Sequence, residues 1–407
     1  MKPPKGWIST PLVDLVQQPA SGVSVLCADD PPMASNPGVL RLSCVTNGRF
    51  NPRDLKTPIP SEVNRLSTFA EADTIIISRS NTPDLVGASA YVRRTYPEAF
   101  LPDTLWALRP KDKSVCMRWL SFVLNSDAYC LLIQSIAHGT SDTMKKIQKG
   151  SFLKLPVLLP PLPERQKIAD ILGTWDEALE KLDALITAKA RRKQALMQQL
   201  LTGHRRLPGF SKPWKQTRFG DLMESEDRYA DFDDDKLYHL VSARRRAVGV
   251  FFREALHGRD IKTKVMKKVH AGDFLISRMQ VVHGGLGVVP PECDGYYASD
   301  SYEVLVPRDP AKLSPRFIGH LCRMRRFWHH ALVCSHGVHI EKMTFVMADF
   351  EHEKFMIPEI AEQRAIAAVL DTADAELRLL RQQRAALDHQ KRGLMQQLLT
   401  GRIRVSL

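Results

Sequence analysis

One 40-residue segment occurs twice in this chain, the second time in diverged form, and the repeat constrains the fold more than any other feature. The segment from Glu164 to Gly203 aligns without a gap with the segment from Glu362 to Gly401, at a constant offset of 198 residues. Both copies end in the same letters, LMQQLLTG. A chain of 407 residues with such a repeat consists of two related halves.

Both copies are predicted to be long helices, because their apolar residues recur at steps of three and four. A glycine follows each copy and proline precedes it, as is typical of helix ends. A continuous helix from Glu164 to Leu201 would be roughly 57 Å long, far longer than the usual globular helix. Each apolar stripe is narrow, which favours an antiparallel coiled coil between the two helices. The alternative is that each helix docks separately on its own domain.

The seam of this coiled coil is predicted from the two stripes. Some of its side chains could instead face partner subunits. The residues assigned to the seam are Leu172, Trp175, Leu179 and Leu182 in the first helix and Leu370, Leu377 and Leu380 in the second.

The regions outside the helices predict one α+β domain in each half. In both, a buried strand ends in Ser-Arg, at Arg79 and Arg278, and a later strand lies beside an aspartate, Asp103 or Asp300. Elsewhere the halves diverge, which indicates shared architecture with different surfaces and a pseudo-twofold internal repeat. The predicted segments are a first domain at 1–160, a helix at 161–203, a linker and second domain at 204–358, a helix at 359–401 and a tail at 402–407.

The charge balance favours a polyanionic partner. Lys and Arg number 58 against 45 Asp and Glu, a formal net charge of +13, and such an excess attracts nucleic acid by neutralising phosphates. The alternatives are a solvated basic face for each cluster and a structural ion pair for the two strand-end arginines. The candidate DNA contacts are Arg79, Arg278, Lys145, Lys146, Arg244, Arg245, Lys267 and Lys268.

Two further features of the sequence predict the cellular compartment of the protein. No apolar run is long enough to cross a bilayer, and the N-terminal MKPPKGWIST has no hydrophobic signal core. The seven cysteines form no CxxC pair, which fits reduced thiols in a protein core. We therefore expect a cytoplasmic protein without a membrane partner.

The helix entries PLPERQKIA and EIAEQRAIA, the LMQQLLTG exits, the HRRLPGF linker and the two divergent domains together resemble the specificity (S) subunit of a type I restriction-modification system. The resemblance covers essentially the whole chain. It implies that each domain is a target recognition domain for one half of a bipartite DNA site, with the coiled coil as a spacer. It also implies two modification (M) subunits, which carry S-adenosylmethionine and methylate adenine, and restriction (R) subunits, which use ATP and Mg.

The predicted rod has a suitable length for that role. At a rise of 3.4 Å per base pair, roughly 57 Å spans about 17 base pairs, so two domains at its ends could read separate stretches of the major groove. Helix length would then set the spacer length.

Two motifs suggest enzyme chemistry only superficially. The run DDPPM at 29–33 resembles the DPPY motif of adenine methyltransferases, but Met33 replaces the aromatic residue that stacks on a flipped base, and no glycine-rich cofactor loop precedes it. The run GGLG at 284–287 lacks the Lys-Ser/Thr of a phosphate-binding loop and predicts a turn or a backbone approach to DNA.

One group of cysteine and histidine residues has some features of a metal site. Cys334, His336 and His339, with His329 and His330 nearby, could hold a metal, yet a second cysteine pair is missing. No Ser/His/Asp or paired-carboxylate arrangement stands out. We therefore expect no catalytic residue, metal or cofactor in this chain. The alternatives are a fused DNA methyltransferase or nuclease, and a coiled-coil adaptor without DNA affinity.

Overall fold

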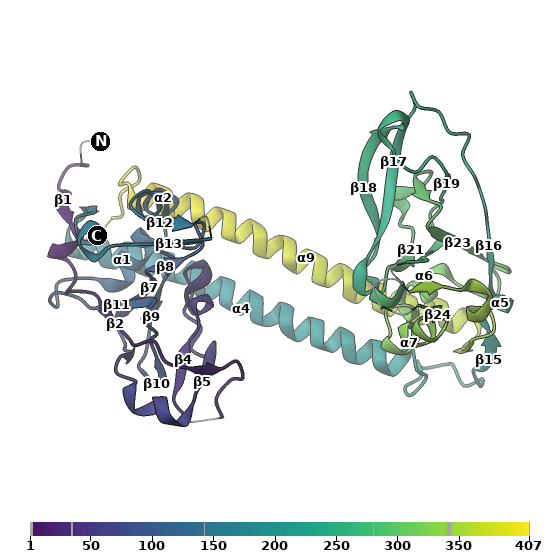
Figure 1. The fold of residues 1–407 in the computed structure, drawn as a ribbon, viewed down its shortest axis with the longest axis horizontal. Coiled ribbons are helices and arrows are strands. Elements are labelled where there is room, and N and C mark those ends of the chain that lie inside the picture. The colour runs from purple at the N-terminus through teal and green to yellow at the C-terminus, as the bar shows by residue number, and fades with distance from the viewer. Residues whose placement is uncertain are drawn as a thin grey trace. The chain divides into compact units, whose positions relative to one another are not determined.

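The computed structural model describes residues 3–33, 36–141, 143–279, 281–337, 339 and 343–406. Two long helices, α4 (Leu162–Leu200) and α9 (Ile360–Leu399), confirm the helices predicted from the repeat (Figure 1). The chain divides into two compact units, each with one domain and parts of both helices: Met1–Asp183 with Gln382–Leu407, and Ala184–Arg381. None of the described helices is both long and apolar enough to cross a membrane.

A four-stranded sheet forms the centre of each domain. In the first domain its order is β2-β11-β7-β9, and in the second it is β16-β23-β20-β21. The middle strands β7 and β20 are buried along their whole length, as their apolar sequences TIIIS and FLIS favour. The bounds are β2 (Ala20–Ser21), β11 (Leu105–Leu108), β7 (Thr74–Ser78), β9 (Ser89–Val92), β16 (Met223–Ser225), β23 (Tyr302–Pro307), β20 (Phe274–Ser277) and β21 (Leu286–Val288).

A second sheet also recurs. Its order is β3-β5-β4-β10-β6 in the first domain and β18-β17-β22-β19 in the second. Each contains one parallel pair, β4 with β10 and β17 with β22. The bounds are β3 (Cys27–Ala28), β5 (Leu55–Pro58), β4 (Gly38–Leu40), β10 (Tyr96–Phe100), β6 (Phe69–Ala70), β18 (Gly249–His257), β17 (Leu237–Arg244), β22 (Tyr297–Ser299) and β19 (Met266–Lys268).

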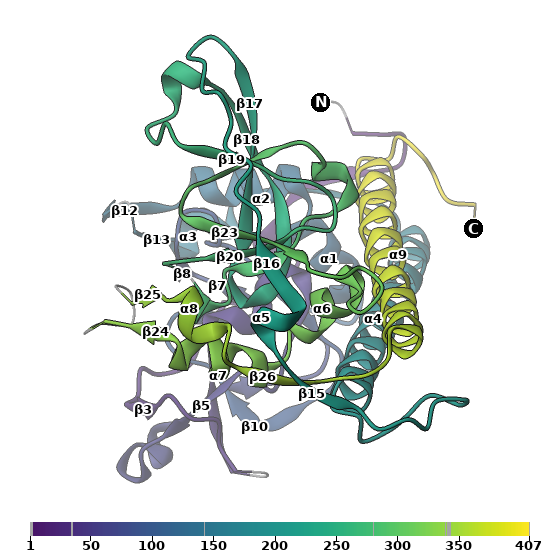
Figure 2. The ribbon, with the colours of Figure 1, turned by 90° about the vertical axis from the view of Figure 1, so that its right-hand side faces the viewer.

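The hairpin in this second sheet is where the two domains differ most. β17 and β18 have eight and nine residues, whereas the corresponding β4 and β5 have three and four. The β17–β18 hairpin therefore extends well away from the helices of its domain (Figure 2). The domains share a topology, as the repeat predicts, but one carries a much longer arm.

Short helices and strands complete each domain and connect it to its long helix. β1 (Ile8–Pro11) pairs with β14 (Pro156–Leu159), which directly precedes α4, and β15 (Lys215–Arg218) pairs with β26 (Lys354–Ile357), which precedes α9. The remaining helices are α1 (Met117–Leu124), α2 (Asp127–Ser135), α3 (Lys149–Leu153), α5 (Phe219–Leu222), α6 (Pro315–Leu321), α7 (Arg325–Val333) and α8 (Met347–Phe350). The remaining strands are β8 (Ser80–Asn81), β12 (His138–Ser141), β13 (Met144–Lys146), β24 (Ser335–His336) and β25 (Thr344–Phe345).

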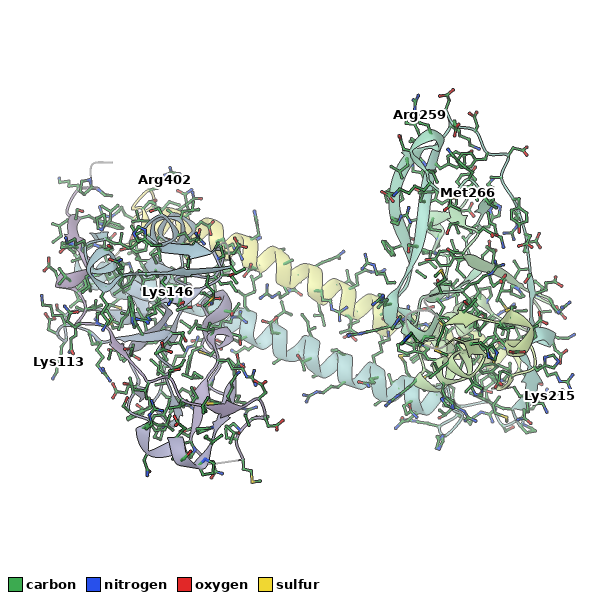
Figure 3. The ribbon with its side chains drawn as sticks, in the orientation of Figure 1. Lys113, Lys146, Lys215, Arg259, Met266 and Arg402 are labelled. Atoms are coloured by element: carbon green, nitrogen blue, oxygen red, sulfur yellow. The ribbon has the colours of Figure 1, made fainter. Side chains whose placement is uncertain are left out.

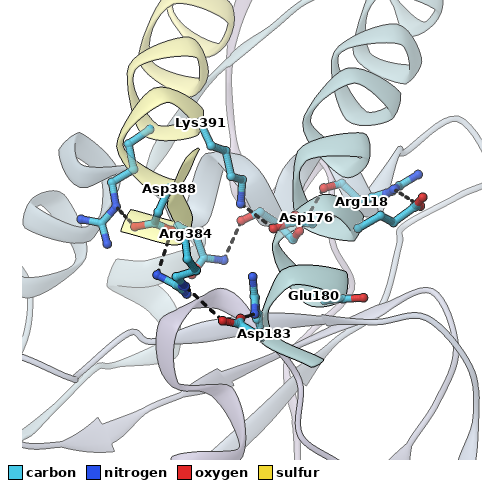
Figure 4. Close-up of polar contacts among 12 residues, drawn as sticks. Arg118, Asp176, Glu180, Asp183, Arg384, Asp388 and Lys391 are labelled. Atoms are coloured by element: carbon cyan, nitrogen blue, oxygen red, sulfur yellow. Dashed lines mark hydrogen bonds and ion pairs between the residues drawn. The ribbon is translucent and has the colours of Figure 1, made fainter. Parts of the chain in front are cut away.

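Within each unit, ion pairs join the segments of α4 and α9. In the first unit Lys391 Nζ lies 2.7 Å from Asp176 Oδ1, and Arg384 Nε lies 3.2 Å from Asp183 Oδ1 (Figure 4). Along α4, Asp176 comes before Asp183, whereas along α9 the partner of Asp176, Lys391, comes after the partner of Asp183, Arg384. The two segments therefore run in opposite directions. The second unit has the same arrangement, with Lys193 paired to Asp374 and Lys189 to Glu376.

A buried glutamate at the start of each long helix forms a second repeated contact. Glu164 accepts a hydrogen bond of 3.0 Å from the Trp7 indole and two from the Arg404 guanidinium, of 2.6 and 2.8 Å. In the second unit Glu362 is held in the same way by Trp214 and Arg206. We call each trio a clasp: Trp7, Glu164 and Arg404 in the first unit, and Trp214, Glu362 and Arg206 in the second. Each clasp joins the start of a domain to the start of one long helix and to the segment that follows the other long helix.

The predicted seam residues fall into three groups. Leu172 and Leu370 belong to the hydrophobic cores of their domains. Leu179 and Leu377 are buried on the long helices outside those cores. Trp175, Leu182 and Leu380 are only half-buried. The beginning of each long helix therefore docks on its own domain, which was the alternative interpretation, while the following turns carry the residues available for helix pairing.

Candidate nucleic-acid interface

A three-stranded sheet, β12-β13-β8, brings three of the predicted DNA contacts of the first domain together. Arg79 follows β7 directly, and its carbonyl accepts a hydrogen bond of 2.8 Å from the Ile147 amide. On β13, Lys145 lies opposite Asn81, and Lys146 lies opposite Ser80. Arg79, which lies between β7 and β8, is therefore close to the strand that carries Lys145 and Lys146, although these residues are far apart in sequence. Figure 3 labels Lys146.

The Arg79 side chain is partly exposed and lies beside an aspartate. One terminal nitrogen is 3.7 Å from Asp103 Oδ2, while the buried Nε finds no hydrogen-bond partner among the described residues. Lys145 Nζ donates a hydrogen bond of 3.2 Å to the Gly139 carbonyl, and Lys146 is exposed. Positive charge is therefore available at this end of the central sheet.

In the second domain a run of backbone hydrogen bonds joins four segments. The Ala247 amide donates to the Gly284 carbonyl at 2.8 Å, and the Ser277 amide donates to the Gly285 carbonyl at 2.9 Å. The Phe345 amide then donates to the Arg278 carbonyl at 2.8 Å. The turn carrying Arg244–Ala247, the glycine run, the end of β20 and β25 consequently form one connected surface.

Arg278 matches Arg79 in position and in partner. Its Nε donates to Glu303 Oε1 at 2.6 Å, and its terminal nitrogen is 3.9 Å from Asp300. The hydrogen bond to Glu303 raises the pKa of Arg278, so the guanidinium stays charged at every pH of interest. Both strand-end arginines thus form the ion pairs that the alternative interpretation anticipated. Such a pair can also orient a guanidinium toward a guanine edge.

Lys267 requires a correction. Its side chain is only 1% exposed, and Nζ lies 2.6 Å from Asp227 Oδ1 and 3.7 Å from Asp300 Oδ1. Successive side chains of a strand point to opposite faces, and the neighbouring Lys268 is exposed. Because a buried, paired ammonium cannot reach a phosphate, we assign Lys267 a structural role and keep Lys268 as a candidate contact.

This assignment predicts different results for two adjacent lysines. Lys267→Met should lower the free energy of unfolding by about 2 kcal/mol, because two partly solvated carboxylates lose their cation. It should leave the salt dependence of DNA binding unchanged. Lys268→Ala should leave stability unchanged. It should lower the salt slope, which is the steepness with which the logarithm of the DNA-binding constant falls with the logarithm of the salt concentration, by about one unit. Urea denaturation measures the stability of both variants, and DNA titrations at several salt concentrations measure their salt slopes. A reduced salt slope for Lys267→Met would show that Lys267 does contact a phosphate.

The other motifs do not gather into a reactive site. Asp29 pairs with Lys56 at 2.8 Å, and Met33 is 82% exposed, so the DDPPM run lies on the surface. His330 pairs with Glu353 and His336 with Asp349. In the described part of the chain no cluster of His, Cys, Asp and Glu is arranged to hold a metal ion.

The first unit also contains a groove of about 1300 Å³ between its domain and its helix segments. Cations and carboxylates of its lining neutralise each other. Arg49 pairs with Asp183 at 2.6 Å, and Lys391 pairs with Asp176 (Figure 4). Because its cations are paired with carboxylates, this groove does not fit a polyanion such as DNA. The surfaces around Arg79 and Arg278 therefore remain the candidate interface.

Comparisons with known proteins show the family to which this chain belongs. A family model of the type I restriction modification DNA specificity domain matches residues 61–189 and 212–389. The putative type I restriction enzyme MjaX specificity subunit of Methanocaldococcus jannaschii is 23% identical over 357 residues, which cover 81% of this chain and 78% of the relative. The MjaVIII specificity subunit of the same organism is 23% identical over 336 residues, covering 76% and 75%.

Solved structures share the fold. The crystal structure of the type I restriction-modification S subunit from M. genitalium matches with a TM-score of 0.60 and 13% identity, over 98% of both chains. A chain from a structure on complex assembly and conformational transition of a type I system matches with a TM-score of 0.55 and 15% identity, over 99% and 100%. With the family model matching most of its length in two copies, the chain belongs to the family of type I restriction-modification specificity subunits.

Proposed function

We propose that this chain is the non-catalytic, DNA-reading subunit of its complex, with each domain reading one half of a bipartite site. The observation that carries the proposal is the repeated topology with divergent surfaces. The central sheets have the same strand order, and both end in an arginine beside an aspartate. The hairpins and basic residues around them differ. Two copies of one scaffold with different surfaces are suited to two different DNA sequences.

The proposal extends to the helices and the partners. The opposite direction of α4 and α9 within each unit supports an antiparallel coiled coil that sets the spacer between the half-sites. Two M subunits would bring S-adenosylmethionine and methylate adenine, and R subunits would bring ATP and Mg. This chain, acting in the cytoplasm, would contribute double-stranded DNA recognition and scaffolding alone.

Methylome mapping tests this proposal. The chain is co-expressed with its candidate M subunit in a host without adenine methylation, and N6-methyladenine is mapped across the genome. We expect a bipartite motif with a fixed gap that disappears when this chain is omitted. If the two proteins co-purify and no new motif appears, the reading function is refuted for this chain.

The strand-end arginines give a residue-level prediction for the same assay. Arg79→Ala and Arg278→Ala should each weaken binding by about 1–3 kcal/mol and relax one base position, because a bidentate arginine contact to guanine is lost. Each change should be confined to one half-site, and the two variants should affect different halves. A uniform loss of binding without relaxed sequence would show that the arginine only supports the sheet end.

A further inference from the structure

The turn between β17 and β18 has an unfavourable backbone conformation. Arg246 and Ala247 adopt φ angles of 65° and 49°, a left-handed region in which a Cβ atom crowds the following carbonyl. Two such residues in succession persist only where the surroundings hold them, and they are often found at functional sites. The turn lies at the end of the hairpin opposite Arg259, which Figure 3 labels.

The glycine run at 284–287 supplies the support. Gly284 accepts the hydrogen bond from the Ala247 amide, and its own φ is +73°. A Cβ atom on Gly284 would lie 2.8 Å from Ala247 N and 2.9 Å from Arg246 Cα. One on Gly287 would lie 2.8 Å from Gly249 Cα. The absence of side chains therefore lets the turn pack directly on this run.

The supported turn presents arginines to solvent. Arg244, Arg245 and Arg246 are exposed. Arg244 lies over the Phe251 ring at 4.5 Å from its centroid, and neither Arg244 nor Arg246 forms an ion pair with any described carboxylate. In the first domain, the loop between β4 and β5 carries Arg49, which Asp183 neutralises at 2.6 Å. Arg244 and Arg246 of this turn thus have no paired carboxylate in the described structure, whereas Arg49 in the corresponding loop of the first domain is paired.

We propose that Gly284 is a positioning residue that holds Arg244 and Arg246 as a preformed clamp for the phosphates of duplex DNA beside the second domain's half-site. This inference rests on the proposed function. As a consequence, this turn of the second domain contributes contacts that depend on salt but not on sequence, in addition to the base contacts of that domain. The arginines need no ordering on binding because the turn is already fixed.

The test uses the full chain in complex with its M subunit and a DNA duplex carrying the mapped site. Affinity is measured against salt concentration for three variants. Arg244→Ala with Arg246→Ala should lower the salt slope by about two units. Gly284→Ala should lower it similarly without removing a charge. The control is Gly272→Ala, which has a φ of +96° but only ordinary contacts at 3.8 Å to Pro315, and it should keep the wild-type slope.

The outcomes separate the inference from the function on which it rests. An unchanged slope for the double arginine variant would overturn the clamp. A reduced slope for that variant together with a wild-type slope for Gly284→Ala would overturn the positioning role. A wild-type complex that does not bind the duplex would overturn the proposed function and this inference with it.

Discussion

Phe327→Ala is expected to lower the stability of the second unit by about 4 kcal/mol, the usual cost of emptying an aromatic site in a packed core. Phe327 on α7 is 1% exposed and has four aromatic neighbours, with ring centroids 5.1–6.2 Å away. Native-state hydrogen exchange should show peptides of residues 215–357 exchanging roughly a thousandfold faster. Peptides of residues 8–159 should keep their protection, because their core is separate.

The matched control is Tyr129→Phe. Tyr129 is the third residue of α2, as Phe327 is of α7. Its buried hydroxyl has no hydrogen-bond partner in the described structure, so its removal should be neutral or slightly stabilising. If Phe327→Ala accelerated exchange equally in both domains, the two cores would not be separate folding units.

Glu164→Gln is expected to open the clasp of the first unit. The Trp7 indole would lose a charged acceptor in a buried position, which should lower the free energy of unfolding by about 2 kcal/mol. The Arg404 guanidinium, which is partly solvated, would lose its charged acceptor as well. Glu362→Gln is the matched variant in the second unit, where Trp214 takes the place of Trp7. Urea denaturation at pH 7 measures both effects.

The clasp also predicts a pH dependence. The hydrogen bond from Arg404, assisted by that from Trp7, lowers the pKa of Glu164. This contribution to stability is therefore complete above the ordinary glutamate pKa of about 4.3 and disappears as the pH falls through the lowered folded-state value. Wild type and Glu164→Gln should differ at pH 7 and converge in strong acid. A constant difference between them at all pH values would exclude ionisation of Glu164 as the source.

The repeat predicted much of this fold because periodicity and helix ends are local signals. The long helices and the α+β domain in each half follow from them. Lys267 shows where such reasoning fails: Lys262, Lys264, Lys267 and Lys268 look like one basic cluster in sequence. Strand alternation and the distant carboxylates Asp227 and Asp300 place Lys267 inside.

Other contacts depend on tertiary structure that a single sequence does not show. The offset of 198 aligns Arg118 with Arg316 and Gly173 with Asp371. Arg118 fills the space beside Gly173, where a Cβ would lie 1.7 Å from its guanidinium, whereas Arg316 hydrogen-bonds Asp371. The contact between Gly284 and Ala247 could not be predicted for the same reason: the sequence predicts a turn at the glycine run, but not that the run packs on a distant arginine-rich turn.

The division of labour between domains and helices is the central claim, and a methylome of a lengthened variant tests it most directly. Seven residues are inserted after Ala184 in α4 and seven after Gln382 in α9, which preserves the apolar period. The Asp183–Arg384 and Lys189–Glu376 pairs on either side keep their partners. Both half-sites should be unchanged and the gap should be longer by about three base pairs, since seven residues add roughly 10 Å. An unchanged gap, or an altered half-site sequence, would contradict the claim.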